Sequence, residues 1–216
     1  EDDIKSYFGA KYACAVSNGT AALHLAGLAL GWGKDDFIIT SPITFLASVN
    51  CIEYSQATPV FVDINPISYT IDLNKLEKRV KQLQSKGKKV RAIIGVDFAG
   101  HPCDWAGLRL LADKYGLQLI NDNCHALGAR YKNKKTYASD YADIVTHSYH
   151  PVKHITTGEG GSVLTNNYSI YENIVSLRTH GMTKDPKKMR KNEGVWYYEM
   201  NKLGFNYRIT DFQSAL

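Results

Sequence analysis

One lysine of the chain stands among residues that favour a reactive amine. The stretch Ser148–Gly161 reads SYHPVKHITTGEGG, so an apolar segment leads into a proline turn, then Lys153, then a glycine-rich return. Lysines usually lie in solvent, but the neighbours of Lys153 are mostly β-branched and small residues rather than other charges. Partial burial among such neighbours favours nucleophilic chemistry of the amine. The stretch therefore predicts a chemically active lysine, with a solvated surface lysine as the alternative.

A second pattern suits a phosphate group. The turn Ser17-Asn18-Gly19-Thr20 joins an apolar run to an apolar helix predicted over 21–30. Such a turn presents unpaired backbone N–H groups and the positive end of the helix dipole to an anion. Any capped helix after a strand gives the same pattern. Because neither GxGxxG nor Gly-Lys-Ser/Thr occurs, a dinucleotide fingerprint and a Walker loop are excluded.

The histidines do not form a metal-binding pattern. His147, His150 and His154 follow Cys124 and His125 along the chain. A proline after His150 interrupts any helix that could align the three histidines, and successive residues of a strand point to opposite faces. The spacing therefore specifies no tetrahedral set of ligands, and we predict no metal site.

These residues must be positioned by strands and helices that alternate along the chain. Apolar, β-branched runs predict strands at 12–17, 37–40, 59–64, 90–96, 117–121 and 142–148. Apolar residues recur at helical spacing from Leu73 to Leu83, with Gly87 as the stop, and another helix is predicted from Asp104 to Tyr115. Apolar strands that alternate with amphipathic helices predict an α/β fold with a mostly parallel mixed sheet between helices.

Sheets of this kind carry their functional side chains at the carboxyl ends of the strands. Asp97, Asp122 and Ser148 each lie at such an end, and we interpret this clustering as a functional signal. The segment Thr183–Val195 is highly charged and contains a proline and a glycine, which predicts a mobile surface loop.

Composition and charge exclude several classes of protein. The 216 residues are 44% hydrophobic, which excludes a disordered or fibrous protein. The net charge of +5 is mild and the lysines concentrate in loop-like runs, so nucleic-acid binding is not expected. The longest apolar stretch, 21–30, has about half the length that crosses a bilayer, so no membrane segment is expected. The four cysteines form no CxxC pair and no secretory leader precedes them, which predicts a reduced, cytoplasmic compartment.

Seven segments occur in the order and at the spacing of one enzyme family. They read NGTAALH from 18, PITFLAS from 42, TPVFVD from 58, NDNCHALGA from 121, SYHPVKHITTGEGG from 148, RTHGM from 178 and LGFNYRITDFQSAL from 203. Over nearly its whole length the chain thus resembles the DegT/DnrJ/EryC1/StrS sugar aminotransferases, fold-type I enzymes that depend on pyridoxal phosphate (PLP). The resemblance implies that residues 1–216 are the PLP-binding large domain, and that the N-terminal segment and the C-terminal small domain of full members are missing.

The resemblance implies a chemical role for three residues. Lys153 corresponds to the lysine that bonds covalently to PLP and, once the amino donor has released it, moves a proton between the substrate carbon and the cofactor. Asp122 corresponds to the aspartate that pairs with the pyridine nitrogen and keeps it protonated. His125 corresponds to a position, Gln or His in the family, that lies against the cofactor.

Five further residues correspond to cofactor-binding positions of the family. Phe45 would stack on the cofactor ring, although a core aromatic residue is the alternative. Gly19, Thr20 and Ser148 would hold the phosphate. Asn206 matches an asparagine that reaches the phosphate from the partner subunit, which implies a homodimer with shared active sites.

Within the group, the segments VDFAG from 96 and EGVWYYE from 193 most resemble the enzyme that aminates C4 of a UDP-linked 4-keto-6-deoxy-N-acetylhexosamine in pseudaminic acid biosynthesis. The resemblance implies glutamate as amino donor and ping-pong kinetics. Alternatives are a dTDP- or GDP-linked keto sugar as substrate, or a catalytically silent binding or regulatory member of the same fold. A sugar dehydratase of the group has histidine in place of the lysine, so the presence of Lys153 argues against one.

Three residues depart from what is common in the family. Asn121 and Asn123 replace the acidic and small residues found beside the aspartate, and Tyr149 replaces a frequent phenylalanine. These departures alter the surroundings of the site more than its chemistry, and they leave the choice of sugar open.

Overall fold

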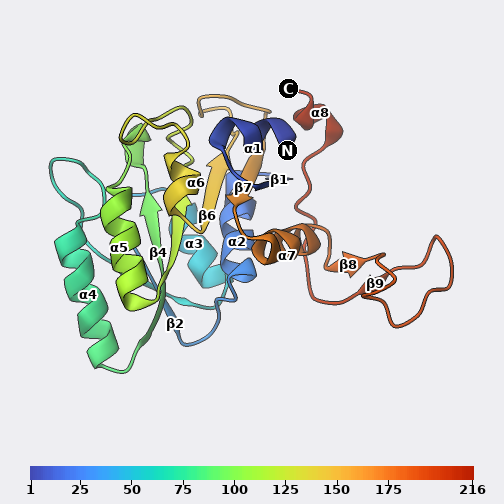
Figure 1. Cartoon of the computed structure of the whole chain (residues 1–216), viewed down its shortest axis with the longest axis horizontal. Coiled ribbons are helices and arrows are strands. Elements are labelled where there is room, and N and C mark those ends of the chain that lie inside the picture. The colour runs from blue at the N-terminus through green and yellow to red at the C-terminus, as the bar shows by residue number, and fades with distance from the viewer.

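Seven strands form one mixed sheet in the computed structural model, which describes all 216 residues (Figure 1). The strands are β1 (Tyr12–Val16), β2 (Asp36–Thr40), β3 (Thr58–Phe61), β4 (Lys89–Val96), β5 (Gln118–Asp122), β6 (Ile144–Ser148) and β7 (Gly161–Thr165). Their order across the sheet is β1-β7-β6-β5-β4-β2-β3. β7 is antiparallel to both neighbours and every other pair is parallel. The predicted mostly parallel sheet between helices is confirmed.

The sequence did not predict β7 as a strand. Its five residues begin with Gly161 and follow two other glycines closely, so the pattern indicated a loop. In the folded chain β7 pairs along its length with β1 and with β6, which buries all five of its residues. Pairing on both edges, rather than the intrinsic preference of the segment, makes it a strand.

Helices cover the sheet on both faces. One face packs against α1 (Asp2–Phe8), α4 (Leu73–Ser85), α5 (Trp105–Tyr115) and α6 (Tyr137–Tyr141). The other packs against α2 (Gly19–Ala29), α3 (Ala47–Tyr54) and α7 (Tyr168–Arg178). The two predicted amphipathic helices are α4 and α5. Leu76, Val80 and Leu83 form the buried stripe of α4, and the Asp72 carboxylate caps its N-terminus by accepting from two backbone N–H groups.

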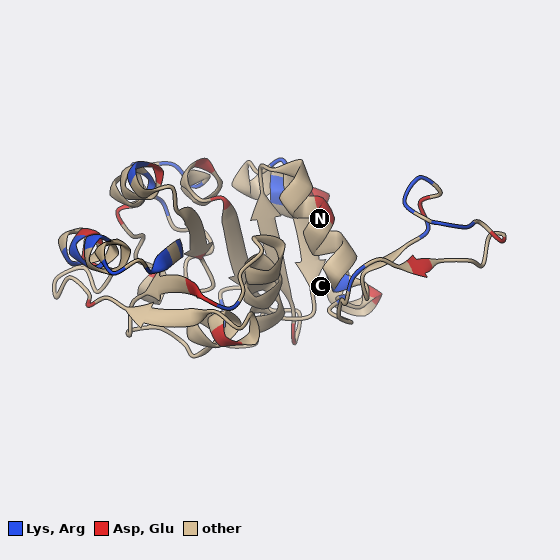
Figure 2. Cartoon of the chain, turned by 90° about the horizontal axis from the view of Figure 1, so that it is seen from below, with Lys and Arg blue, Asp and Glu red and all other residues tan.

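The last part of the chain leaves the sheet and returns to it. A two-stranded ribbon, β8 (Met182–Thr183) and β9 (Glu199–Met200), carries the charged segment that was predicted as a surface loop. This segment forms an arm that projects from the body of the molecule, and several of its side chains are basic (Figure 2). The chain then runs back along the end of α7 and finishes in α8 (Asp211–Ser214), where Thr210 forms a capping box with Gln213.

All four cysteines are free thiols. No helix combines the length and the apolar character needed to cross a bilayer.

Candidate active site

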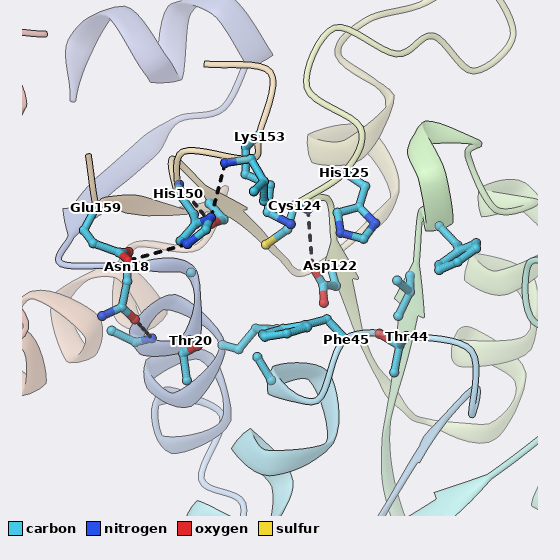
Figure 3. A pocket seen from close by; sticks show the side chains of 18 of the residues that line it. Asn18, Thr20, Thr44, Phe45, Asp122, Cys124, His125, His150, Lys153 and Glu159 are labelled. Carbon is cyan, nitrogen blue, oxygen red and sulfur yellow. Dashed lines mark hydrogen bonds and ion pairs between the residues drawn. The ribbon is translucent and has the colours of Figure 1, made fainter. Parts of the chain in front are cut away.

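A pocket of about 810 Å³ opens where the carboxyl ends of β1, β5 and β6 meet the N-terminus of α2 (Figure 3). Of the eight site residues expected from the sequence, seven line it: Gly19, Thr20, Phe45, Asp122, His125, Ser148 and Lys153. Parallel strands bring their carboxyl ends to one edge, so residues more than a hundred positions apart meet there.

Asp122 is held by hydroxyl and amide donors. It is the last residue of β5 and only 5% exposed. Its Oδ2 accepts from Ser48 Oγ at 2.5 Å, and its Oδ1 accepts from Cys124 N at 3.2 Å. Since Ser48 has one hydroxyl proton and gives it to the carboxylate, Thr44 Oγ1 must be the donor in its 2.6 Å contact with Ser48 Oγ. The carboxylate is therefore fixed toward the pocket.

Sequence reasoning assigned no role to Ser48 and Thr44. Both lie in the segment from 42 to 48 that carries the family resemblance, but nothing in a serine's neighbours indicates contact with an aspartate 74 residues away. Thr44 lies in the loop before α3 and Ser48 in the first turn of that helix, so only the folded chain shows that the two hydroxyls meet.

Lys153 lies on a short loop at the mouth of the pocket and is half-buried. Its backbone N–H donates to His150 O at 2.9 Å. The Tyr149 carbonyl accepts from Thr156 Oγ1 at 2.9 Å and from Thr157 N at 3.1 Å, which closes the loop at its base. The amine thus stands on a backbone segment that is hydrogen-bonded at both ends.

His125 and Cys124 stand between this loop and Asp122 (Figure 3). Burial lowers the pKa of His125, and the nearby Lys153 cation adds to the shift. Burial raises the pKa of the Cys124 thiol well above its usual range, and the Asp122 carboxylate adds to that shift. At neutral pH both side chains are therefore uncharged.

The N-terminus of α2 forms an anion cradle. Asn18 Oδ1 accepts from Ala21 N at 2.8 Å, but the N–H groups of Gly19 and Thr20 have no partner within the chain. A Cβ atom on Gly19 would lie 2.7 Å from Ser148 Cβ, so only glycine lets the Ser148 hydroxyl come this close to the helix end. Two N–H donors and a hydroxyl therefore converge on one region of the pocket.

Phe45 contributes a flat apolar wall. Its side chain is 64% exposed although it lines the pocket, and Figure 3 shows its ring extending across the pocket below Asp122. The predicted alternative, a core aromatic residue, is excluded by this exposure.

Asn206 does not reach the pocket of its own chain. It forms a β-bridge with Thr179 on the returning segment, and its side chain is exposed. The residues on either side turn inward instead, because Phe205 packs on the His24 ring and Tyr207 OH lies 3.2 Å from His24 Nδ1. Tyr207, and not Asn206, lines the pocket.

Asp97 corrects the interpretation of the strand-end carboxylates as one functional cluster. It does not line the pocket and is fully buried on the opposite side of the strand end. Its oxygens accept from Cys103 N, Trp105 Nε1, Asn123 Nδ2 and Tyr137 OH. Burial raises its pKa to about 6 against the opposing effect of these donors. Because successive residues point to opposite faces, Val96 lines the pocket and its neighbour does not.

No group of three or more histidine, cysteine, aspartate or glutamate side chains is arranged to hold a metal ion. The histidines considered above as ligands are dispersed: His147 is buried within the sheet, His154 is exposed, and His150 faces Glu159 at 3.9 Å.

Two curated relatives are similar to this chain over nearly its whole length. The UDP-4-amino-4,6-dideoxy-N-acetyl-beta-L-altrosamine transaminase of Campylobacter jejuni is 40% identical over 216 residues, which is 100% of this chain and 54% of the relative. The GDP-perosamine synthase of Escherichia coli O157:H7 is 37% identical over 206 residues, which is 95% of this chain and 52% of the relative. The chain therefore spans about half the length of these relatives.

Solved structures share the fold. The Helicobacter pylori aminotransferase PseC, involved in the biosynthesis of pseudoaminic acid, superposes with a TM-score of 0.85 at 32% identity, covering 100% of this chain and 54% of that one. Spr1654 of Streptococcus pneumoniae, solved in a PLP-form, gives a TM-score of 0.86 at 28% identity, covering 100% of this chain and 56% of that one. These neighbours are PLP aminotransferases of fold type I, as the sequence predicted.

The family model of the DegT/DnrJ/EryC1/StrS aminotransferases matches residues 1–216, the whole chain. The sheet order and the residues that line the pocket agree with this match. The chain belongs to the DegT/DnrJ/EryC1/StrS aminotransferase family.

Proposed function

We propose that this chain carries the cofactor site of a PLP-dependent aminotransferase that acts on a nucleotide-linked keto sugar. The observation that supports it most directly is that a half-buried lysine, a fixed carboxylate and an anion cradle face one pocket. Those are the three groups that a flat, phosphate-bearing aldehyde with a ring nitrogen requires.

The geometry of the pocket is compatible with such a cofactor. Because Gly19 has no Cβ, Ser148 approaches the start of α2 closely, and a phosphate there would meet its hydroxyl together with the free N–H groups of the helix. Phe45 offers an exposed ring face to a planar heterocycle, and Asp122 offers a carboxylate to its nitrogen. In this arrangement Gly19, Thr20 and Ser148 hold the phosphate, and Lys153 supplies the amine for covalent attachment.

When bound, PLP supplies an electron-withdrawing ring that stabilises negative charge on the substrate carbon. Asp122 keeps the ring nitrogen protonated, and Ser48 and the Cys124 N–H hold that carboxylate in place. Lys153 Nζ, once free, would move the proton between the substrate carbon and the cofactor. His125, whose pKa burial lowers, would line the cofactor site without adding charge.

For the substrate we favour a UDP-linked 4-keto-6-deoxy-N-acetylhexosamine aminated at C4, as in pseudaminic acid biosynthesis, with glutamate as donor. The similarity to a UDP-sugar transaminase and to PseC supports this choice, and the similarity to a GDP-perosamine synthase supports a GDP-linked keto sugar as the second candidate. The four free thiols agree with a reducing, cytoplasmic compartment.

We further propose a homodimer in which Asn206 of each subunit serves the phosphate of its neighbour. The exposed position of its side chain, away from its own pocket, supports a role in trans. The projecting arm that precedes it gives the chain a segment that extends beyond its own body (Figure 2).

Two measurements on the full-length protein test the proposal. Borohydride reduction after addition of PLP should attach the cofactor to Lys153, which peptide mass mapping would locate, and Lys153→Ala should show no attachment. A panel of UDP-, dTDP- and GDP-linked 4-keto sugars, each with glutamate, should then identify the aminated product. A protein that neither binds PLP nor aminates any of the sugars would instead be the silent member of the fold.

A further inference from the structure

A continuous hydrogen-bonded network lies directly behind the pocket. His147 Nε2 lies 3.1 Å from Asn123 Oδ1, and His147 Nδ1 lies 3.2 Å from Ser162 Oγ. Ser162 Oγ lies 2.7 Å from Tyr149 OH, and Asn123 Nδ2 lies 2.9 Å from Asp97 Oδ2. We call these five side chains the Asp97–Tyr149 network. All are buried, the most exposed being Tyr149 at 4%.

Each hydrogen bond of the network has a defined direction. Asn123 uses its NH₂ toward Asp97 and Tyr137, so its Oδ1 accepts from His147 Nε2. Burial lowers the pKa of His147 to about 3, so the ring is neutral and its Nδ1 accepts from the Ser162 hydroxyl. Ser162 in turn accepts from Tyr149 OH. Every donor points toward the Asp97 carboxylate, and no member can be replaced without leaving a partner unpaired.

The network alternates with the pocket residues along the strand ends. Asn123 lies between Asp122 and Cys124, and His147 and Tyr149 lie on either side of Ser148. Since successive residues point to opposite sides, a side chain locked in the network fixes the backbone that presents its neighbour to the pocket.

The network also reaches the loop that carries Lys153. Tyr149 holds Ser162 through its hydroxyl, and its carbonyl accepts from Thr156 Oγ1 and from Thr157 N at the base of that loop. Asp122, Ser148 and the Lys153 loop are therefore attached to one buried structure.

We propose that the members of the Asp97–Tyr149 network are positioning residues for the pocket. They hold Asp122, Ser148 and the Lys153 loop in the arrangement that receives the cofactor. The part of this inference that concerns cofactor affinity rests on the proposed function, whereas the part that concerns the order of the loop does not. Asn123 and Tyr149 are two of the three residues that depart from the family pattern, so the family resemblance did not itself imply this network.

Ser162→Ala in the full-length protein interrupts the network at its centre, because it removes both the acceptor for Tyr149 and the donor to His147. Thr165→Val is the matched control: it removes another buried hydroxyl from β7, one that donates to Asp143 O at 2.8 Å at the far end of the strand. Tyr149→Phe removes only the terminal hydroxyl and preserves the ring, so it supplies a second interruption that keeps the core filled.

The first readout is hydrogen–deuterium exchange of the protein without cofactor. Peptides that cover 121–125 and 147–158 should exchange about ten-fold faster in Ser162→Ala than in the parent, and should be unchanged in Thr165→Val, because a buried hydrogen bond contributes on the order of one decade to a local equilibrium. Equal exchange of these peptides in Ser162→Ala and in Thr165→Val would overturn the proposal, whether or not the protein binds PLP.

The second readout is the dissociation constant for PLP. It should rise about ten-fold in Ser162→Ala, and adding Tyr149→Phe should weaken binding by less than about two-fold more, because the network is already interrupted. If the two substitutions instead raised the dissociation constant by factors that multiply in the double variant, the proposal of one shared network would be overturned. A parent protein without PLP affinity would instead contradict the proposed function, and the exchange measurement alone would then decide for or against the network.

Discussion

Replacing Gly19 by alanine tests the anion cradle at the start of α2. The added Cβ would lie 2.7 Å from Ser148 Cβ, 3.2 Å from Ser148 Oγ and 3.4 Å from Cys124 Sγ. Two carbon atoms in contact are ordinarily about 3.5 to 4.0 Å apart, so Ser148 or the first turn of the helix must move by about 1 Å. Either movement separates the Ser148 hydroxyl from the free N–H groups with which it would share an anion.

The expected effect is a loss of PLP affinity larger than the loss of stability explains. A hydrogen bond to a charged group contributes about 1.5 to 3 kcal/mol, so losing one raises the dissociation constant about ten- to 150-fold. Titration of the cofactor-free, full-length protein with PLP, followed by visible absorbance, measures this constant. Chemical denaturation without cofactor measures stability separately.

Gly27→Ala is the control, since it makes the same change in the same helix. Its Cβ would lie 2.6 Å from Trp32 Cε3 and 2.7 Å from Ser55 Oγ, in the core and away from the pocket. Overpacking of either kind costs about 1 to 3 kcal/mol of unfolding free energy, offset by up to about 1 kcal/mol from the helix preference of alanine. If Gly27→Ala weakened PLP binding as much as Gly19→Ala, or if Gly19→Ala bound PLP like the parent, the cradle would be refuted.

Three further predictions concern single residues. Asp122→Asn should retain PLP but lose about two to four decades of turnover, because removing one partner of a buried ion pair costs on the order of 3 to 5 kcal/mol; a rate near that of the parent would exclude the role of the carboxylate. Mixing full-length Lys153→Ala with full-length Asn206→Asp, each nearly inactive alone, should restore about a quarter of parent activity, since half of randomly exchanged dimers are mixed and each has one intact site; no recovery despite measured exchange would reject a site shared between subunits. Burial lowers the pKa of His147 to about 3, so between pH 3 and 6.5 the folded chain binds fewer protons at His147 than the unfolded chain. The contribution of His147 to the free energy of unfolding therefore falls as the pH is lowered through this range. The difference in unfolding free energy between the parent and His147→Gln should therefore narrow by about 2 kcal/mol from pH 7 to pH 5, and a constant difference would contradict a neutral, buried ring.

Much of the fold could be read from the sequence, because its strongest signals are local. Six of the seven strands follow from apolar, β-branched runs, and α4 and α5 follow from spacing and from their capping residues. Gly116, at φ 65°, ends α5 directly after the predicted last residue, Tyr115, since glycine adopts the left-handed region without strain. β7 was missed because its identity depends on two neighbouring strands and not on its own five residues.

The sequence by itself determined which residues could carry chemistry, since the strand-end rule placed Asp122 and Ser148 at one edge of the sheet and the family resemblance added Lys153. Only the tertiary structure decided which strand-end residue faces which side. Asp97 and Asp122 look equivalent in sequence, yet the first is enclosed by four donors behind the sheet and the second is aimed into the pocket by Ser48. The physical reason is that a side chain's role depends on its distances to partners tens of residues away, and packing of the helices sets those distances.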